Sequence, residues 1–145
     1  MSSNRVEVHR SVLAIRWGDM DALGHVNNTL YFRYMEQARL EWIYAFAGEG
    51  NPYDRESGPL IVNASCTFHE PLVYPGAIEV VMSLGDAGRT SVGSYYRITR
   101  DGRTVADGES RIVWVNLESG RPTPLPEAVR QLLPDDVPSS GVAPR

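Results

Sequence analysis

Residues 16–32, RWGDMDALGHVNNTLYF, bring together the side chains of this chain that are best suited to chemistry. Two aspartates, one of the three histidines and two adjacent asparagines stand directly before an aromatic run. A carboxylate can act as a general base or as a nucleophile. The first turn of a helix offers unpaired N–H groups and a positive dipole end to a developing negative charge. The stretch is therefore either a connector that ends in a helix cap or a reaction centre.

The loop in this stretch is long enough to fold back on whatever follows it. Asp21 stands seven residues before Asn28, so its carboxylate can return to the neighbourhood of Asn28. Gly24 lies between the two and allows a tight turn of the backbone. A turn role is the usual interpretation of an isolated loop aspartate, and for Asp19 we prefer that structural interpretation.

The segment after the loop has the spacing of an amphipathic helix. From Thr29 to Ala47, apolar residues recur at spacings of three and four, which predicts a helix of about five turns at ~3.6 residues per turn. The apolar positions are Tyr31, Tyr34, Met35, Ala38, Trp42, Ala45 and Phe46. Asn27, Asn28 and Thr29 are candidate N-caps, and Gly48 supplies the stop. Such a helix would place its first turn beside the loop.

The rest of the chain has the alternation of strands, with turn residues between the runs. The expected elements are strands at 6–16, 60–69, 78–84, 92–100 and 104–116, a loop at 50–59, turns at 75–76 and 101–102, a possible bulge at Gly108 and a short helix at 126–133. One strand, a long helix and then strands in hairpins predict an α+β fold, with a mostly antiparallel sheet wrapped around the long helix. The edges of such a sheet need cover, so a homo-oligomer is expected.

Length and hydropathy limit the class of protein. The 145 residues fit a single domain over 1–133, followed by a disordered tail over 134–145. No apolar run is long enough to cross a bilayer, and the N-terminus MSSNRVEVHR lacks the apolar core of a secretory signal. We therefore expect a cytoplasmic protein without a membrane partner.

Charge and cysteine content exclude further classes. A net charge of −4 disfavours nucleic acid as a partner. All 14 basic residues are arginine, which excludes a catalytic lysine. Cys66 is the single cysteine, alternates with apolar residues and is expected in the core. No Cys/His cluster has metal-binding spacing, so we expect no metal site.

The sequence also resembles a known family. RWGDMDALGHVNNTLYFRYMEQAR, followed by FHEPLVYPG and GRTSVGSYYRI, resembles the 4-hydroxybenzoyl-CoA thioesterase family of the hotdog-fold superfamily. It is especially similar to bacterial acyl-CoA thioesterases that carry a D-x-x-G-H-V-N-N segment, and the resemblance covers residues 6–118. It implies a hotdog fold with a five-stranded sheet, and hydrolysis of an acyl-CoA thioester to free acid and CoA. It also implies a homodimer or homotetramer with sites at the subunit interface, and no cofactor beyond the coenzyme A of the substrate.

The resemblance implies roles for individual residues. Asp21 falls on the family's catalytic carboxylate, and the backbone N–H of Asn28 falls on the group that polarises the thioester carbonyl. His25 would orient the substrate or hydrogen-bond Asp21, or else only shape the loop. The residues expected along the substrate path are Asn27, Tyr31, Leu60, Val62, Arg89, Thr90 and Ser91, with Arg55 and Arg103 as weaker phosphate contacts. Thioester hydrolysis needs an activated water or nucleophile and a stabilised oxyanion, which this loop and helix start could supply.

Several of these residues also have an ordinary structural interpretation. We expect Asn27 to fix the loop rather than to contact a ligand. The ordinary interpretation of Arg89 is a solvent-exposed residue of a hairpin. Glu36 is the competing carboxylate, because another hotdog branch places its catalytic acid on the central helix. Arg33 stands three residues before Glu36 and favours an ion pair on the helix surface instead.

Two other functions compete with hydrolysis. A non-catalytic module on the same fold would bind acyl-CoA and release no thiol, because a fold alone does not determine a function. A hotdog dehydratase would move protons with a paired histidine and carboxylate, although this loop does not match the dehydratase motifs. Thiol release from an acyl-CoA separates hydrolysis from both alternatives.

Overall fold

The computed structural model describes residues 4–48, 50–52 and 55–134 of the chain. The elements in that part are β1 (Val6–Ile15), the 3₁₀ turn η1 (Trp17–Asp19), α1 (Asn28–Ala47), β2 (Ser57–Phe68), β3 (Gly76–Gly85), β4 (Ser91–Arg100), β5 (Arg103–Asn116) and α2 (Glu127–Leu132). The tail expected over 134–145 lies outside the described residues, apart from Pro134.

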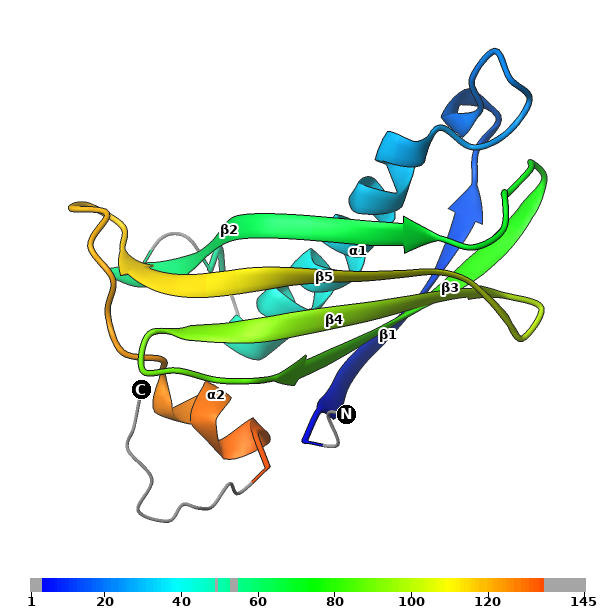
Figure 1. The fold of residues 1–145 in the computed structure, drawn as a ribbon. Coiled ribbons are helices and arrows are strands. Elements are labelled where there is room, and N and C mark those ends of the chain that lie inside the picture. The colour runs from blue at the N-terminus through cyan, green and yellow to red at the C-terminus, as the bar shows by residue number, and fades with distance from the viewer. Residues whose placement is uncertain (1–3, 49, 53–54, 135–145) are drawn as a thin grey trace.

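The strands form one antiparallel sheet that curls around α1 (Figure 1). The strand order is β1-β3-β4-β5-β2, and every neighbouring pair is antiparallel. α1 lies mainly against β1 and β3 and makes few contacts with β2. The α+β class and the hotdog architecture of a sheet around a long helix are therefore confirmed.

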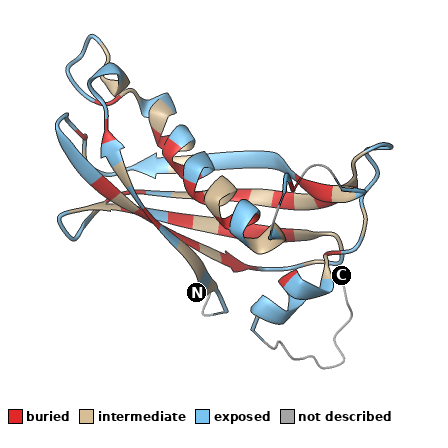
Figure 2. Cartoon of the chain, turned by 180° about the vertical axis from the view of Figure 1, so that it is seen from behind, coloured by how far each residue is buried: buried red, intermediate tan, exposed pale blue. Residues whose placement is uncertain are grey.

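α1 buries one side of its surface against the inner face of the sheet (Figure 2). The buried residues are Tyr31, Tyr34, Met35, Ala38, Trp42 and Ile43. Their spacing keeps them on one stripe of a helix with ~3.6 residues per turn. The last turn differs from the expectation, because Ala45 is exposed and Ile43 is buried. The burial of aromatic rings on this stripe fixes the helix along the sheet.

Gly108 does not form the expected bulge. It pairs in register with Cys66 on β2 and with Tyr96 on β4. The sheet is irregular elsewhere, between 61 and 63 and between 98 and 99. A Cβ at position 108 would clash with the Met35 sulfur, so the glycine lets the helix approach the sheet closely.

β2 begins earlier than expected and forms one edge of the sheet. The segment 57–59, expected to belong to a loop, is paired with β5, with Pro59 opposite Trp114. An edge strand tolerates proline because half of its N–H groups have no strand to meet. Apolar side chains on β2 are open to solvent, with Leu60 46% and Val62 58% exposed. The edge is therefore both unpaired and apolar in the single chain.

A polar contact joins α1 to β1 on the side away from β2. His9 Nε2 lies 2.8 Å from Glu41 Oε1, and Gln37 Nε2 donates to Glu41 Oε2 at 3.0 Å. Burial acts to raise the pKa of Glu41, but hydrogen bonds from Gln37, His9 and Ser11 outweigh it and lower the pKa. Glu41 is thus held as a carboxylate that ties the helix to the first strand.

Candidate active site

Asp19 fastens the loop after β1 to the helix. Its Oδ2 accepts hydrogen bonds from the Arg16 N–H at 2.9 Å and from the Tyr34 hydroxyl at 2.7 Å. Its carbonyl accepts the Asn27 N–H at 2.9 Å. Burial, together with the neighbouring Asp19 carboxylate, raises the pKa of Tyr34. The phenol therefore stays protonated and donates a hydrogen bond to Asp19. Asp19 therefore has the structural role expected for it.

Asp21 forms a compact turn that leaves one carboxylate oxygen available. Its N–H donates to the His25 carbonyl at 2.9 Å, and its Oδ1 accepts the Leu23 N–H at 2.9 Å. Gly24 has φ +87° and donates its N–H to the Asp21 carbonyl at 3.0 Å, as the tight turn requires. No described residue donates a hydrogen bond to Oδ2. The carboxylate therefore both shapes the turn and offers a free oxygen.

The start of α1 leaves one N–H without an acceptor. Asn27 is the N-cap, and its Oδ1 accepts both the N–H and the hydroxyl of Thr29 at 2.9 Å. The Leu30 N–H donates to the Asn27 carbonyl at 2.9 Å. The Asn28 N–H has no acceptor among the residues that the structure describes. It stands at the positive end of the dipole of a 20-residue helix, where an anionic oxygen is stabilised.

Asp21 and Asn28 line the same pocket, at the end of β2. The pocket has a volume of about 380 Å³, within the ~300–1,000 Å³ usual for small-molecule sites. Its lining residues are Asp21, Leu23, His25, Val26, Asn28, Tyr31, Phe68, His69, Glu70 and Pro71. The Tyr31 ring packs edge-on against Phe68, with ring centroids 4.9 Å apart. Four residues expected in the site, Asp21, His25, Asn28 and Tyr31, are thus brought together.

A family model of the thioesterase-like superfamily matches residues 15–133, which include the loop, α1 and the far wall of the pocket. The chain belongs to this thioesterase-like superfamily.

Solved and curated relatives agree with this family. A Pseudomonas aeruginosa protein described as a candidate thioesterase is 34% identical, with a TM-score of 0.79, over 86% of this chain and 97% of that chain. A gentisyl-coenzyme A thioesterase is 25% identical, with a TM-score of 0.76, over 83% of this chain and 98% of that chain. A candidate esterase from Aquifex aeolicus strain VF5 is 29% identical over 125 residues, which are 83% of this chain and 94% of that protein. The chain is a thioester hydrolase.

His25 contributes its backbone to this thioesterase loop. Its carbonyl accepts the Asp21 N–H, and no hydrogen bond joins the two side chains. The imidazole lines the pocket without a hydrogen-bond partner among the described residues. The loop-shaping role is therefore present, and contact with a substrate stays a prediction. Asn27 does not line the pocket, because its side chain is engaged in capping α1.

The other substrate-path residues lie toward the far end of the sheet. Leu60 and Ser91 both pair with Val113 of β5. Phe68, which lines the pocket, pairs with Ala106. Seven residues of β5 separate these positions, or about 23 Å at ~3.3 Å per residue. The residues placed there are Leu60, Val62, Arg89, Thr90 and Ser91. Their contact with a substrate stays a prediction that needs a second copy of the chain.

Two of the three arginines expected near phosphates, Arg55 and Arg103, already make local contacts. Arg103 Nη2 lies 3.0 Å from Glu70 Oε1, and Arg55 Nη2 donates to the Ala47 carbonyl at 2.9 Å. At the hairpin before β4, Arg111 Nε donates to Ser91 Oγ at 3.2 Å. Arg89 is exposed there, as expected of a solvated hairpin residue.

Glu36 lies outside the pocket that holds Asp21. It pairs with Arg33 at 3.6 Å on the helix surface, as its spacing predicts. It borders a separate groove of about 430 Å³ between α1 and the β2 side of the sheet, together with Phe32 and Ala64.

No three His, Cys, Asp or Glu side chains in the described part of the chain are placed to hold a metal ion. No described helix is long and apolar enough to cross a membrane.

Sequence reasoning missed the far wall of the pocket. Phe68 ends β2, and His69, Glu70 and Pro71 follow it. This wall lies about forty residues along the chain from Asp21 and Asn28. The link is a hydrogen bond from the Val26 N–H to the Leu72 carbonyl at 2.8 Å. The hydropathy pattern carries no sign of this long-range contact, and the His-Glu-Pro run at a strand end was the available signal.

Cys66 is predicted to be unreactive. Burial, with a smaller effect from the Asp107 charge, raises the pKa of its thiol to about 11. Thiolate is then about 100-fold rarer than in a thiol of the ordinary pKa 9.0, so iodoacetamide at pH 8 should label folded protein about 100-fold more slowly than protein in urea. Mass spectrometry of timed samples measures the two rates. Cys66→Ala should keep its turnover, and rapid labelling that abolishes turnover would contradict the prediction.

Proposed function

We propose that this protein is an acyl-CoA thioesterase that converts acyl-S-CoA and water to free acid and CoA. One observation carries the proposal: Asp21, whose Oδ2 accepts no hydrogen bond from the described residues, and Asn28, whose N–H has no acceptor among them, line one pocket. A carboxylate and an oxyanion donor are the two groups that acyl transfer to water requires. The names of the neighbours support this reaction class, and one of them is a thioesterase for an acyl-CoA.

The proposed reaction begins with the thioester carbonyl oxygen at the Asn28 N–H. As the carbonyl carbon becomes tetrahedral, the oxygen gains negative charge, which the N–H and the helix dipole stabilise. Asp21 either removes a proton from the attacking water or attacks the carbon itself to form an anhydride, which water then cleaves. In both routes the carbon–sulfur bond breaks and the CoA thiolate leaves and is protonated.

A panel of acyl-CoA thioesters with a colorimetric thiol reagent tests the proposal. The panel contains straight-chain acyl groups, an enoyl group and aryl groups, including gentisyl-CoA, and it reports kcat and KM for each. Saturable turnover with at least one thioester supports the function. Saturable binding without thiol release would instead establish an acyl-CoA-binding module, and loss of enoyl-CoA absorbance would establish a dehydratase.

We also infer that a second copy of the chain covers β2. The edge has unpaired backbone groups and exposed Leu60, Ile61 and Val62, the combination that natural proteins cover by pairing. The groove beside Phe32 and Ala64 continues this surface onto α1. Antiparallel pairing of two β2 strands would set the start of one strand against the end of the other. With Ser57 opposite the partner's Phe68, the partner's Leu60 would lie opposite Ser65, toward the pocket end of β2, and the partner's Val62 would lie opposite Asn63 in the middle of the strand.

A charge at this edge is predicted to separate the subunits. Val62→Glu should convert the dimer to a monomer, because burial of two unpaired carboxylates in an apolar interface costs several kcal/mol. Light scattering after gel filtration measures the mass, and thiol release measures the activity. The matched control is Val12→Glu on β1, where Val12 is also exposed at the opposite edge. An unchanged mass for Val62→Glu, with the chain folded, would contradict a β2 interface.

A further inference from the structure

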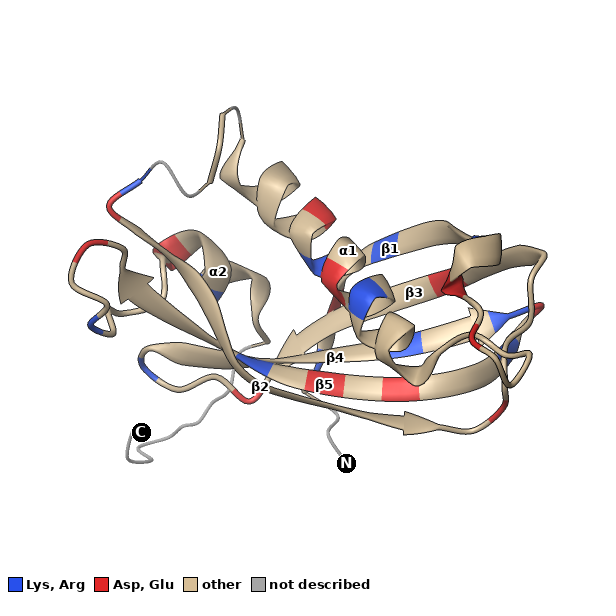
Figure 3. Cartoon of the chain, turned by 90° about the horizontal axis from the view of Figure 1, so that it is seen from above, with Lys and Arg blue, Asp and Glu red and all other residues tan. Residues whose placement is uncertain are grey.

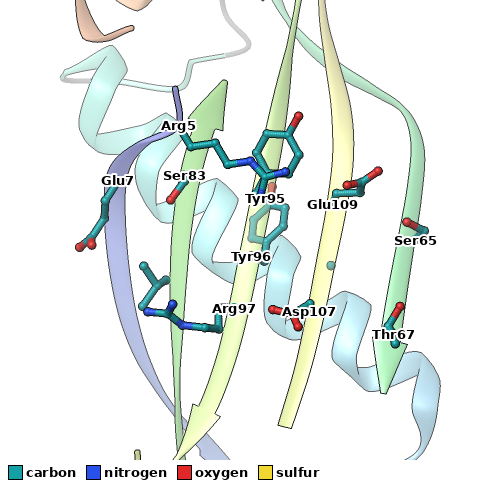
Figure 4. Close-up of a pocket in the computed structure, with 12 residues that line it drawn as sticks. Arg5, Glu7, Ser65, Thr67, Ser83, Tyr95, Tyr96, Arg97, Asp107 and Glu109 are labelled. Atoms are coloured by element: carbon teal, nitrogen blue, oxygen red, sulfur yellow. The ribbon is translucent and has the colours of Figure 1, made fainter. Parts of the chain in front are cut away.

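The far wall of the pocket holds a histidine whose ring is fixed by a carboxylate. His69 directly follows β2, and its N–H donates to the Val105 carbonyl at 2.8 Å. Its Nε2 lies 2.9 Å from Asp107 Oδ2. Figure 4 shows Asp107 on β5 beside Thr67 of β2, on the outer face of the sheet. The contact therefore joins the end of β2 to β5.

Asp107 has no other charged partner in the described chain. Arg97 is its register partner on β4, but the two make no ion pair, and the next outward residue of β5 is the acidic Glu109 (Figure 4). Figure 3 shows the acidic positions along β5. A carboxylate only accepts hydrogen bonds, so the Nε2 atom that faces Asp107 carries a proton. In the neutral ring, the other nitrogen, Nδ1, is then a hydrogen-bond acceptor.

His69 and Glu70 are the polar residues of this wall. Glu70 holds an ion pair with Arg103 through its Oε1 at 3.0 Å, which fixes the position of its carboxylate. Phe68 and Pro71 offer only apolar surface. The His69 side chain is 44% exposed, and His69 is one of the residues that line the pocket.

We propose that His69 is a substrate-binding residue of the thioesterase site and that Asp107 is its positioning residue. Nδ1 of His69 accepts a hydrogen bond from an O–H or N–H group of the acyl thioester. The inference rests on the proposed function, since it concerns the substrate of that same pocket. Two parts of such a substrate carry donors of this kind: a hydroxyl on the acyl group and an amide N–H on the pantetheine arm.

Two variants test the proposal. His69→Phe keeps a planar ring without an acceptor, and it should raise KM about fivefold with little change in kcat, the effect of losing about one net hydrogen bond. Asp107→Asn keeps the shape of the side chain, but its amide can donate to Nε2 and so move the ring proton to Nδ1. That exchange turns the acceptor into a donor, and it should raise KM in the same way. Thermal unfolding checks that each variant is folded.

The choice of thioester distinguishes the two groups of the substrate that could donate to His69. A KM effect confined to hydroxylated acyl groups, compared with the same acyl skeleton without hydroxyl, assigns the acyl hydroxyl. An effect on every CoA thioester that disappears with an amide-free thiol as leaving group assigns the pantetheine amide. Either result supports the proposal.

Glu41→Gln is the matched control, because it breaks the other His–carboxylate contact, His9 with Glu41 at 2.8 Å, away from the pocket. It should leave KM unchanged. An unchanged KM in both His69→Phe and Asp107→Asn would overturn the proposal, as would an equal loss on every thioester including donor-free ones. A loss of kcat at constant KM would overturn it in favour of a catalytic role. A wild-type protein that hydrolyses nothing would overturn the proposed function instead, so the two failures are distinct.

Discussion

Asp21→Asn is expected to lower kcat by about 10²–10⁴-fold, the usual contribution of a positioned catalytic base. The amide oxygen can still accept the Leu23 N–H that Oδ1 accepts at 2.9 Å, so the turn is kept. The second oxygen, which has no protein donor among the described residues, becomes an NH₂ group that can neither accept a proton nor attack a carbonyl carbon. Steady-state thiol release measures the loss, and thermal unfolding shows whether the loop has stayed in place.

Glu36→Gln is the control for this variant. Glu36 is the carboxylate that another hotdog branch would use, and here it pairs with Arg33 at 3.6 Å outside the pocket. It should therefore keep the kcat of the wild type. The opposite result, with turnover lost in Glu36→Gln and kept in Asp21→Asn, would assign the catalytic role to Glu36 on the helix instead of Asp21 in the loop.

Asn28→Pro is expected to lower kcat by about 10²–10³-fold, as the loss of one oxyanion donor does in other hydrolases. The substitution removes the backbone N–H itself. Asn28 is the first residue of α1, a position where proline is favoured because its N–H has no helical acceptor. The preceding residue, Asn27, already has φ −61° and ψ 137°, the extended conformation that proline requires before it. The helix should therefore form normally.

Asn28→Ala separates the backbone from the side chain at the same position. It keeps the N–H and removes only the side-chain amide, so its kcat should stay close to that of the wild type. Equal turnover in the proline and alanine variants, with both folded, would show that the N–H takes no part in the reaction. A loss in both would assign the role to the side chain.

The helices and strands were largely predictable because the apolar residues of each recur with a clear period. Apolar residues at three- and four-residue spacing placed α1 within one residue of its observed start, Asn28. Alternation placed the strands, but the sequence did not separate a paired edge from a loop at 57–59, where Gly58 and Pro59 suggested a turn. Gly108 looked like a bulge, because a sequence does not report that Met35 from the helix occupies the space above it.

The near side of the site was predictable and the far side was not. Asp21, Gly24 and Asn28 are close in sequence, so turn chemistry and helix ends already bring them together. The role of Asp21 came from the family resemblance, since a turn aspartate has no signature of its own. The 68–71 wall meets the loop through long-range contacts, and the 60–62 and 89–91 segments lie at the other end of the sheet, where only a second chain would relate them to the pocket.

The loop that carries Asp21 is fastened within its own chain, by Asp19 to Tyr34 and by Val26 to Leu72. On the proposed assignment, the Asp21 carboxylate and the Asn28 N–H of each catalytic centre thus come from one polypeptide. A neighbouring copy of the chain adds only residues that line the substrate path. The stoichiometry follows directly: an assembly of any size has as many catalytic centres as it has chains. A hybrid with one inactivated chain would lose that chain's share of the turnover and no more.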